Sequence, residues 1–353
     1  MIRYRRLPVA DIVEETPDAC SLVLAVPPEL AAEFAYRPGQ YLTIRVPGAA
    51  GGAVARCYSL SSSPHTDDHL KITVKRVPDG RASNWICDHV RAGAVLELLP
   101  PSGAFTPGSL DGDLLLLAGG SGITPVMSII KSALALGSGH LTLVYANRDP
   151  ASVIFAAELR ALEERHPSRL RVAHWFDNAQ GPPDAGKLAP LLASYADRDA
   201  YVCGPEPFVA VARKALGQLG VPETRVHIER FHSALTPATA EADDPAPEAS
   251  DAGEAVPALN GAAAATAEVH LDGQVHRLPW AANTRLLDLL ISAGLNPPYS
   301  CRQGTCGACA CRVLEGEVEL VHNEILEDED FAEGYTLACQ AIPRTATVRV
   351  TYS

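Results

Sequence analysis

Four cysteines in the C-terminal quarter of the chain have a spacing that indicates metal chemistry. Cys301, Cys306 and Cys309 lie in the run CRQGTCGAC, and Cys339 follows after 29 intervening residues. This spacing is typical of four thiolates that hold two tetrahedral irons in a 2Fe–2S cluster. The two glycines of the run allow the backbone to turn closely around such a cluster. A structural zinc site is the alternative, but zinc sites usually contain two C-x2-C pairs, whereas this chain has one.

A second site is indicated by the run GGSGITP at residues 119–125, which follows the apolar segment LLLLAG. A glycine-rich turn from a strand into a helix directs backbone N–H groups and the positive end of the helix dipole at a pyrophosphate. Pro125 stands where a third glycine would complete G-x-G-x-x-G, and proline suits the first turn of a helix. Taken alone, the run is equally compatible with a tight structural turn.

Two further runs contain side chains suited to a phosphate and a flat ring. Arg56, Tyr58 and Ser59 lie in the run RCYS, where arginine can pair with phosphate, tyrosine can pack on a ring, and serine can hydrogen-bond a ring nitrogen. The run GRASN at residues 80–84 begins a helix with small residues and could hold a second phosphate. In isolation, each run is more often a surface loop.

These runs are distributed over the domains of a multidomain chain. Residues 1–110 contain short strand-like segments separated by proline and glycine, which predicts an antiparallel β-barrel. Residues 111–232 alternate apolar strands with helical segments, which predicts an α/β doubly wound domain. Residues 233–266 are rich in alanine, proline and acidic residues, so we expect a disordered linker, with a helix through the alanine run as the alternative. Residues 267–353 return to short strands around one helix and the cysteine run.

Composition and the N-terminal run exclude several classes of function. A net charge of −13 argues against nucleic acid as a partner. The run MIRYRRLPVA lacks the apolar core of a secretory signal, and there is no stretch of about eighteen apolar residues, so we expect a cytoplasmic location and no membrane partner. In that reducing compartment the remaining cysteines are expected to be thiols. They are Cys20, Cys57, Cys87, Cys203 and Cys311, of which Cys311 is the one most easily mistaken for a cluster ligand.

The order of these runs resembles that of a known enzyme family. The runs RCYS, GGSGITP and CGP (residues 203–205) resemble the ferredoxin–NAD(P) reductase family over residues 1–232. Residues 267–353 resemble a plant-type 2Fe–2S ferredoxin, which implies an α+β (β-grasp) domain. The combination is the layout of reductases that supply electrons to bacterial oxygenases. The runs VARCYSLSSSP, YANRD and CGACAC are most similar to reductases of 3-ketosteroid 9α-hydroxylase systems, with phenylacetyl-CoA epoxidase reductases as the alternative.

The resemblance implies roles for individual residues. Ser59, near the reactive flavin nitrogen, and Cys203, near the nicotinamide, are the implied catalytic residues. The implied ligands of the cluster are Cys301, Cys306, Cys309 and Cys339. The implied binding residues for FAD and the nicotinamide dinucleotide are Arg56, Tyr58, Ser59, Lys75, Gly80, Ser83, Gly119, Gly120, Gly122, Thr124, Cys203, Gly204 and Phe231, and Glu229 is also expected near the flavin.

The implied function is electron transfer from NADH through FAD and the 2Fe–2S cluster to a terminal oxygenase with a Rieske centre. A flavin is needed because nicotinamide gives up two electrons as hydride, whereas the cluster accepts one at a time. NADH is favoured over NADPH because Asp149 follows Arg148 and would repel a 2′-phosphate. A reductase of an aromatic-ring hydroxylase and a non-enzymatic 2Fe–2S redox sensor are the alternatives.

Six acidic residues lie shortly before the last predicted cluster ligand: Glu324, Glu327, Asp328, Glu329, Asp330 and Glu333. We expect them to form an acidic face of the cluster domain. Such a face either is an ordinary solvated surface or steers docking onto a basic patch of the oxygenase.

Overall fold

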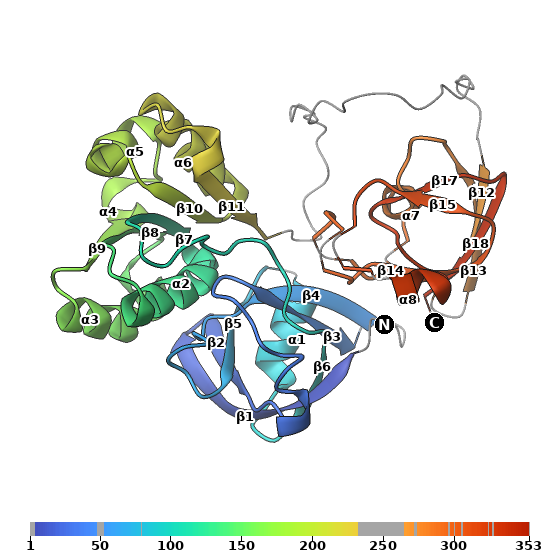
Figure 1. Cartoon of the computed structure of the whole chain (residues 1–353), viewed down its shortest axis with the longest axis horizontal. Coiled ribbons are helices and arrows are strands. Elements are labelled where there is room, and N and C mark those ends of the chain that lie inside the picture. The colour runs from blue at the N-terminus through green and yellow to red at the C-terminus, as the bar shows by residue number, and fades with distance from the viewer. Residues whose placement is uncertain are drawn as a thin grey trace. The chain divides into compact units, whose positions relative to one another are not determined.

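The computed structural model describes residues 4–47, 53–78, 80–231, 265–271, 274–295, 297–299, 301–304, 306–323, 325–326 and 328–352. The chain forms two compact units, residues 2–231 and residues 232–353 (Figure 1). Most of the expected linker, residues 233–264, lies outside the described residues. Its last two residues, Ala265 and Thr266, belong to a strand. In the described part of the chain, no helix has both the length and the apolar character needed to cross a membrane.

The first unit begins with an antiparallel barrel. Its strands are β1 (Arg5–Thr16), β2 (Ala19–Leu24), β3 (Tyr41–Pro47), β4 (Ala53–Ser59), β5 (Leu70–Lys75) and β6 (Val95–Leu98), in the order β4-β3-β6-β1-β2-β5. A bridge between Leu60 and Ile72 joins the two edges of this sheet. Period-two alternation turns aliphatic side chains such as Leu22 and Leu42 into the fully buried interior. Helix α1 (Arg81–His89) covers the barrel and packs Ile86 into the same core.

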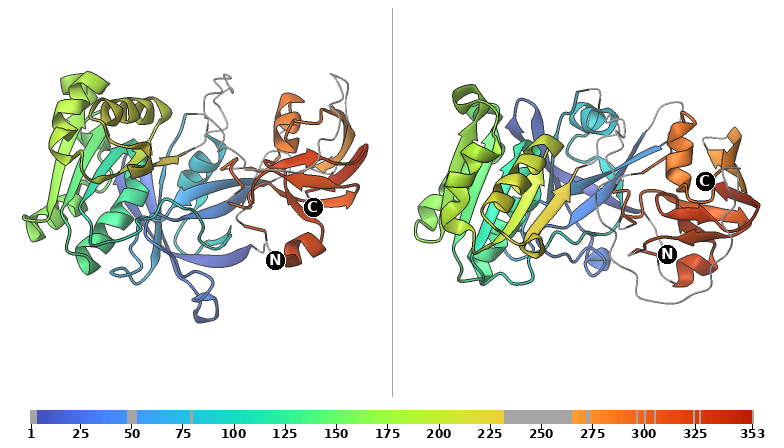
Figure 2. Two further views of the ribbon diagram at one scale, coloured as in Figure 1. Left: turned by 45° about the horizontal axis from the view of Figure 1, so that its top comes forward. Right: turned by 90° about the horizontal axis from the view of Figure 1, so that it is seen from above.

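The rest of the first unit is a parallel sheet with helices on both faces (Figures 1 and 2). Its strands are β7 (Leu114–Gly119), β8 (Leu141–Asn147), β9 (Leu170–Phe176), β10 (Asp199–Gly204) and β11 (Val226–Arg230), in the order β11-β10-β7-β8-β9. Helices α2 (Ile123–Leu136) and α3 (Ala156–Arg165) cover one face, and α5 (Ala185–Leu192) and α6 (Glu206–Gln218) cover the other. The short α4 (Asp177–Gln180) follows β9. The strand order reverses between β7 and β10, where open α/β sheets bind their ligands.

The second unit is built on a mixed five-stranded sheet with the order β13-β12-β18-β14-β16. Its elements are β12 (Ala265–Leu271), β13 (Gln274–Trp280), α7 (Leu286–Ser292), β14 (Ala310–Glu315), β15 (Val318–Leu320), α8 (Asp328–Ala332), β16 (Tyr335–Leu337), β17 (Ala341–Pro343) and β18 (Thr347–Thr351). Strands β12 and β18 are parallel, and the other pairs in the sheet are antiparallel. With α7 buried through Leu286, Leu287 and Leu290, this is the expected β-grasp arrangement, and the predicted three-part fold class is confirmed.

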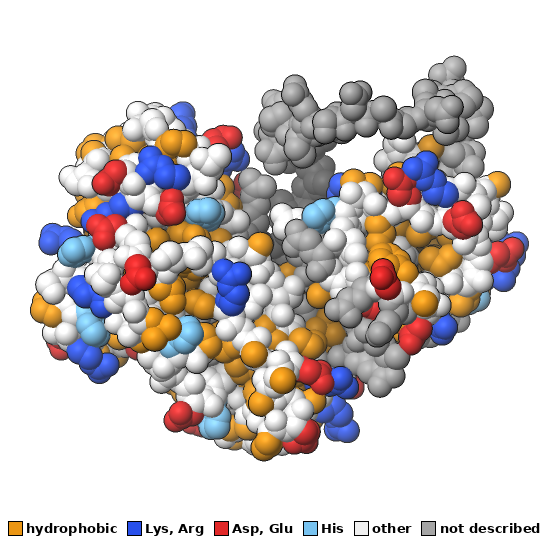
Figure 3. Space-filling model, in the orientation of Figure 1, with side chains coloured by type: hydrophobic (Ala, Val, Ile, Leu, Met, Phe, Trp, Pro, Cys, Tyr) orange, Lys and Arg blue, Asp and Glu red, His pale blue; other side chains and the backbone are white. Residues whose placement is uncertain are grey.

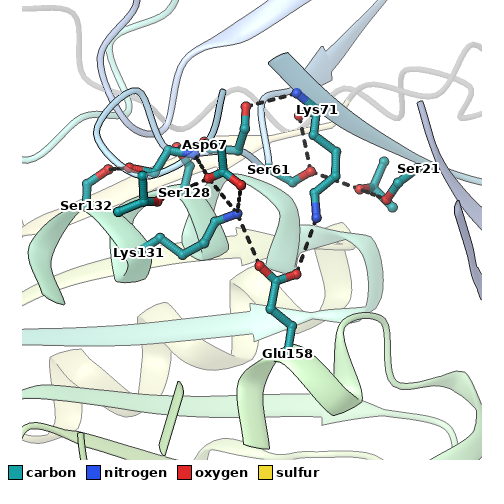
Figure 4. Close-up of polar contacts among 12 residues, drawn as sticks. Ser21, Ser61, Asp67, Lys71, Ser128, Lys131, Ser132 and Glu158 are labelled. Carbon is teal, nitrogen blue, oxygen red and sulfur yellow. Dashed lines mark hydrogen bonds and ion pairs between the residues drawn. The ribbon is translucent and has the colours of Figure 1, made fainter. Parts of the chain in front are cut away.

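A buried ion-pair network joins the barrel to the parallel-sheet domain (Figure 4). The Nζ atom of Lys131, on α2, is 2.9 Å from Asp67 Oδ2 and 3.2 Å from Glu158 Oε1, and its side chain is only 7% exposed. Glu158 also pairs with Lys71 at 3.3 Å. Two hydrogen bonds join the same helix to the barrel: Ser128 Oγ donates to the Ser62 carbonyl, and the hydroxyls of Ser132 and Ser63 are hydrogen-bonded to each other. Because α2 directly follows the glycine-rich turn, the network fixes that turn against the barrel.

Candidate functional site

A cavity of about 730 Å³ lies between the barrel and the carboxyl ends of the parallel strands. The sheet contributes residues at or directly after the ends of β7, β8, β9 and β10, and the barrel contributes the turn after β1 and the segment after β5. Of the predicted binding residues, Lys75, Gly119 and Gly120 line this cavity. Asp18, Asn147, Arg148, Asp177 and Phe208 also line it and were not among the predicted binding residues.

The glycine-rich turn needs its glycines for close packing. Gly120 has a φ of +52°, and a Cβ added to Gly122 would lie 2.1 Å from the carbonyl oxygen of Cys203. The hydroxyl of Tyr145 donates to the Gly120 carbonyl at 3.0 Å, and Thr124 Oγ1 donates to the carbonyl of Ser121 at 3.0 Å. These contacts fix the turn, and no side chain caps the start of α2, so the positive end of the helix dipole is open to a pyrophosphate.

Two side chains that line the cavity carry buried polar atoms with no hydrogen bond in the described chain. Both the nitrogen and the oxygen of the Asn147 amide are buried without a hydrogen bond, as is Asp177 Oδ1. Buried polar atoms of folded proteins are almost always hydrogen-bonded, so their partners are expected to come from a ligand. Ribose hydroxyls and amide groups of a nicotinamide dinucleotide supply suitable donors and acceptors, and these residues therefore fit that ligand.

Each basic side chain that lines the cavity lies within ion-pair distance of a carboxylate, and two of them share one. Arg148 Nη2 lies 2.9 Å from Asp18 Oδ2, and Lys75 Nζ lies 3.8 Å from the same oxygen. Burial lowers the pKa of Lys75, and the negative charge of Asp18 opposes that effect. Arg76 pairs with Asp88 at 2.7 Å. A 2′-phosphate would therefore have to displace a carboxylate from its cation.

The acid that meets Arg148 comes from a different place than the sequence predicted. Asp149 Oδ1 accepts a hydrogen bond from the backbone N–H of Ser152 at 2.9 Å and caps the short helix η4 (Pro150–Ser152). Asp149 does not line the cavity. A local capping interaction thus holds Asp149, and the carboxylate that pairs with Arg148 at the cavity is Asp18 of the barrel.

The predicted flavin residues gather at the end of β4 and the start of α1. Ser59 Oγ is buried and has no hydrogen-bond partner in the described chain, and Arg56 Nη1 donates to the carbonyl of Ala55. Burial raises the pKa of Tyr58 far above its usual value of 10.0, so its phenol keeps its proton. Gly80 begins α1 with no side-chain cap on the first N–H groups. An unpartnered serine and an uncapped helix start are the features that a flavin ring and a pyrophosphate would complete.

Cys203 lies at the end of β10 and is fully buried. Burial raises the pKa of its thiol far above the usual 9.0, and the nearby Glu229 on β11 adds to the effect. The thiol is therefore protonated at neutral pH, and Cys203 packs in the core between the sheet and α2. Gly204 follows in the same turn, and a Cβ there would meet Phe208 at 2.8 Å. Phe231 is 38% exposed, directly after β11.

The four predicted cluster ligands come together around one loop. Backbone N–H groups point at their sulfurs: Gln303 at Cys301 (3.3 Å), Ala308 at Cys306 (3.4 Å) and Cys339 at Cys309 (3.5 Å). Contacts with the thiols of Cys301 and Cys309 raise the pKa of Cys339, which shows how closely these sulfurs crowd together. Positive φ angles at Arg302 (58°), Gly304 (81°) and Gly307 (67°) produce the tight turn.

Crowded sulfurs with N–H donors fit a 2Fe–2S cluster, whose negative charge such donors stabilise. Among the described residues, no three His, Cys, Asp or Glu side chains form a site for a single metal ion. In a 2Fe–2S centre each iron takes only two cysteines, so this arrangement is compatible with the cluster. Cys311 is buried in β14, and burial raises the pKa of its thiol. Cys311 therefore lies in the five-stranded sheet and not in the loop that carries Cys301, Cys306 and Cys309.

The expected acidic face is only partly described. Glu324 and Glu327 lie outside the described residues, and Asp328 is exposed. Asp330 is 2% exposed, so its expected place on the surface is wrong. On the face shown in Figure 3, acidic and basic side chains are interspersed over each unit.

Comparison with known proteins identifies the family. Three family models match: an oxidoreductase FAD-binding domain over residues 6–106, an oxidoreductase NAD-binding domain over residues 116–214, and a 2Fe-2S iron-sulfur cluster binding domain over residues 269–344. The chain is 52% identical over 347 residues to the 3-ketosteroid-9-alpha-monooxygenase, ferredoxin reductase component of Rhodococcus rhodochrous, covering 98% of this chain and 96% of the relative. The chain belongs to this family of oxygenase reductases.

More distant relatives share the same layout. One subunit of the 1,2-phenylacetyl-CoA epoxidase of Escherichia coli is 33% identical, with 100% of this chain and 98% of the relative covered. The solved structure of phthalate dioxygenase reductase covers 99% of this chain and 98% of its own, with a TM-score of 0.60 and 24% identity. The predicted family is thus confirmed, as are the flavin, nicotinamide and 2Fe–2S cofactors, and the chain is an oxidoreductase.

Proposed function

We propose that this chain carries electrons from NADH through FAD and the 2Fe–2S cluster to the Rieske-type oxygenase of a 3-ketosteroid 9α-hydroxylase, in cytoplasmic steroid degradation. The observation that carries the proposal is 52% identity over nearly the full length of a reductase of that system. The direction of transfer is also favourable. Clusters of the plant type have potentials near about −400 mV, and Rieske centres lie higher, from about −150 to +300 mV.

NADH binds in the 730 Å³ cavity, with its pyrophosphate at the start of α2. The Asn147 amide can both donate to and accept from the dinucleotide, and Asp177 Oδ1 can accept from a ribose hydroxyl, because these atoms are buried without a hydrogen bond in the described chain. NADH is favoured over NADPH because Asp18 pairs with both Arg148 and Lys75, and its negative charge opposes a 2′-phosphate there. The buried Cys203 thiol packs near the nicotinamide and moves no proton, since burial keeps it protonated.

FAD is held by Arg56, Tyr58 and Ser59 on one side and by the start of α1, Gly80 and Ser83, on the other. When bound, FAD accepts a hydride and releases electrons singly, which is the chemistry that couples nicotinamide to an iron–sulfur cluster. Ser59 Oγ, buried beside this site, supplies a hydrogen bond to the ring. The Lys131 network keeps α2, and with it the nicotinamide, in a fixed position against the flavin side of the barrel.

The test is reconstitution with two alternative acceptors. The purified chain is mixed with NADH and either a 3-ketosteroid 9α-hydroxylase oxygenase with a 3-ketosteroid, or a phenylacetyl-CoA epoxidase with phenylacetyl-CoA. Product is quantified by mass spectrometry against NADH consumed. We expect hydroxylated steroid in near-stoichiometric yield with the first acceptor and little product with the second. Efficient epoxidation without steroid hydroxylation would contradict the proposal.

A further inference from the structure

Two cysteines of the barrel that take no part in the cluster lie against each other. Cys20, on β2, and Cys87, on α1, are 67 positions apart, yet their Sγ atoms are 3.6 Å apart. The strand register pairs Cys20 with Val74 of β5, and the Cys87 thiol lies 3.9 Å from the Val74 carbonyl oxygen. The two side chains therefore meet over the same pair of strands.

This pair differs from the other cysteines that are not cluster ligands. Cys20 and Cys87 are half-buried, so small reagents can reach them, whereas Cys203 and Cys311 are fully buried. Cys57 is also half-buried, but its Sγ atom contacts the hydroxyl of Thr43 at 3.4 Å. Cys20 and Cys87 thus combine access with direct sulfur contact.

The surroundings distinguish the two thiols. The hydrogen bond from Cys87 lowers the pKa of Cys20 against the opposing effect of burial, and the guanidinium of Arg76 lowers it further. The same contact raises the pKa of Cys87. Since the thiolate is the reactive form, Cys20 is the nucleophile of the pair and Cys87 is the resolving thiol.

We propose that Cys20 and Cys87 form a site of reversible oxidation, at which a hydroperoxide converts the two thiols into an intramolecular disulfide. With hydrogen peroxide, the Cys20 thiolate attacks one oxygen, the O–O bond breaks, hydroxide leaves, and Cys20 becomes a sulfenic acid. The Cys87 sulfur then displaces that oxygen as water and forms the S–S bond. Two thiols and one peroxide give one disulfide and two waters. The sulfurs must approach by about 1.5 Å to reach a bond of about 2.05 Å, a movement within the reach of side-chain rotation.

The disulfide would restrain the flavin side of the barrel. Cys87 lies one helical turn after Ser83, so both side chains are on the same face of α1. The pair also lies near Tyr58, another predicted flavin residue. Burial is the main cause of the raised pKa of Tyr58, and negative charge on Cys87 or Cys20 raises it further. A bond between α1 and β2 is expected to slow the release of FAD. This consequence rests on the proposed flavin site, whereas the disulfide itself does not.

The test uses the full, FAD- and cluster-loaded chain. It is treated with hydrogen peroxide, or with diamide as an oxidant that forms disulfides directly, and remaining thiols are alkylated under denaturing conditions. Trypsin separates the two cysteines into residues 7–45 and residues 82–91, and places Cys57 in residues 57–71. We expect the first two peptides to be joined, with a mass two hydrogens below their sum. The Cys57 peptide should remain alkylated, and dithiothreitol should restore both thiols.

Recovery of Cys20 and Cys87 as separately alkylated peptides after either oxidant would overturn the proposal without the need for a variant. FAD release is then followed by flavin fluorescence after dilution into mild denaturant. We expect release to be several-fold slower after oxidation in the native chain and unchanged by oxidation in Cys87→Ser and Cys20→Ser. A linked chain that releases FAD at the unlinked rate would refute the effect on the flavin, while the peptide map would still establish the disulfide.

Discussion

Replacing Lys131 by methionine tests whether the buried network of Figure 4 joins the two domains of the first unit. The substitution keeps most of the volume and the apolar stem of the side chain, and removes the ammonium that contacts Asp67 and Glu158. Two carboxylates from different domains would then face each other at the interface without the cation between them.

The expected loss follows from burial and from the remaining partners. Removing one partner of a buried ion pair costs about 3–5 kcal/mol. The carboxylates of Asp67 and Glu158 are 29% and 33% exposed, so water reaches them in part. In the variant, Asp67 still accepts a hydrogen bond from the Ser63 N–H at 2.7 Å, and Glu158 still forms an ion pair with Lys71 at 3.3 Å. We therefore expect the low end, a loss of about 3 kcal/mol in the free energy of unfolding of this unit.

The assay is urea unfolding of the FAD-loaded chain, followed by flavin fluorescence so that the first unit is observed selectively. The matched control is Arg213→Met, which removes an ion pair to Glu223 at 3.3 Å whose side chains are 41% and 91% exposed. That change should cost about 0–1 kcal/mol. In the double variant Asp67→Asn with Lys131→Met, part of the loss should be recovered, because one unpaired carboxylate is removed. If Lys131→Met costs no more than Arg213→Met, the network does not hold the domains together.

Three further predictions concern the cofactor sites and the same interface. Cys306→Ser should abolish the visible bands of the cluster while NADH–ferricyanide activity persists, because that dye takes electrons from the flavin; loss of iron from Cys311→Ser would show that the ligands were misassigned. Asp18→Asn should raise kcat/KM for NADPH relative to NADH by about tenfold, since loss of one neutralising charge near a phosphate is worth about 1.4 kcal/mol; an unchanged ratio would refute the role of Asp18. Burial alone would raise the pKa of Asp67, but the Ser63 N–H and Lys131 lower that pKa below the usual 3.8. The ionised Asp67 therefore stabilises the fold above pH 3.8, and this stabilisation is lost as the pH falls through the lowered pKa. Denaturant midpoints measured from pH 5 downward should therefore fall more steeply for the native chain than for Asp67→Asn, and parallel curves would count against this.

Much of the fold was predictable because local patterns determine it. The run LLLLAG is continuously apolar since β7 is buried on both faces of a parallel sheet, and the helix after GGSGITP begins at Ile123, within the predicted run. The cysteine loop was also predictable from a local pattern, because Gly304 and Gly307, which allow its tight turns, lie among the cysteines in the sequence. The left-handed conformation of Arg302 in that loop has no such signal in the sequence.

The parts that were missed depend on contacts between distant segments. The pair of Asp18 with Arg148 joins residues 130 positions apart, and only the packing of barrel against sheet brings them together. Asp149 was the acid adjacent to Arg148 in sequence, but its position after a strand and three residues before Ser152 makes it a helix cap. The Lys131 network was not predicted either, since a lysine on an otherwise apolar helix gives no indication of its partners.

The most direct test of the proposed electron path is anaerobic addition of NADH to the purified chain in the absence of any oxygenase. The flavin band is followed by visible absorption, and the cluster is followed by electron paramagnetic resonance at low temperature. The account predicts that the flavin bleaches first and that the signal of a reduced 2Fe–2S cluster then appears, and that Cys306→Ser shows the bleaching alone. A flavin that is fully reduced by NADH while the cluster of the native chain stays oxidised would contradict the account.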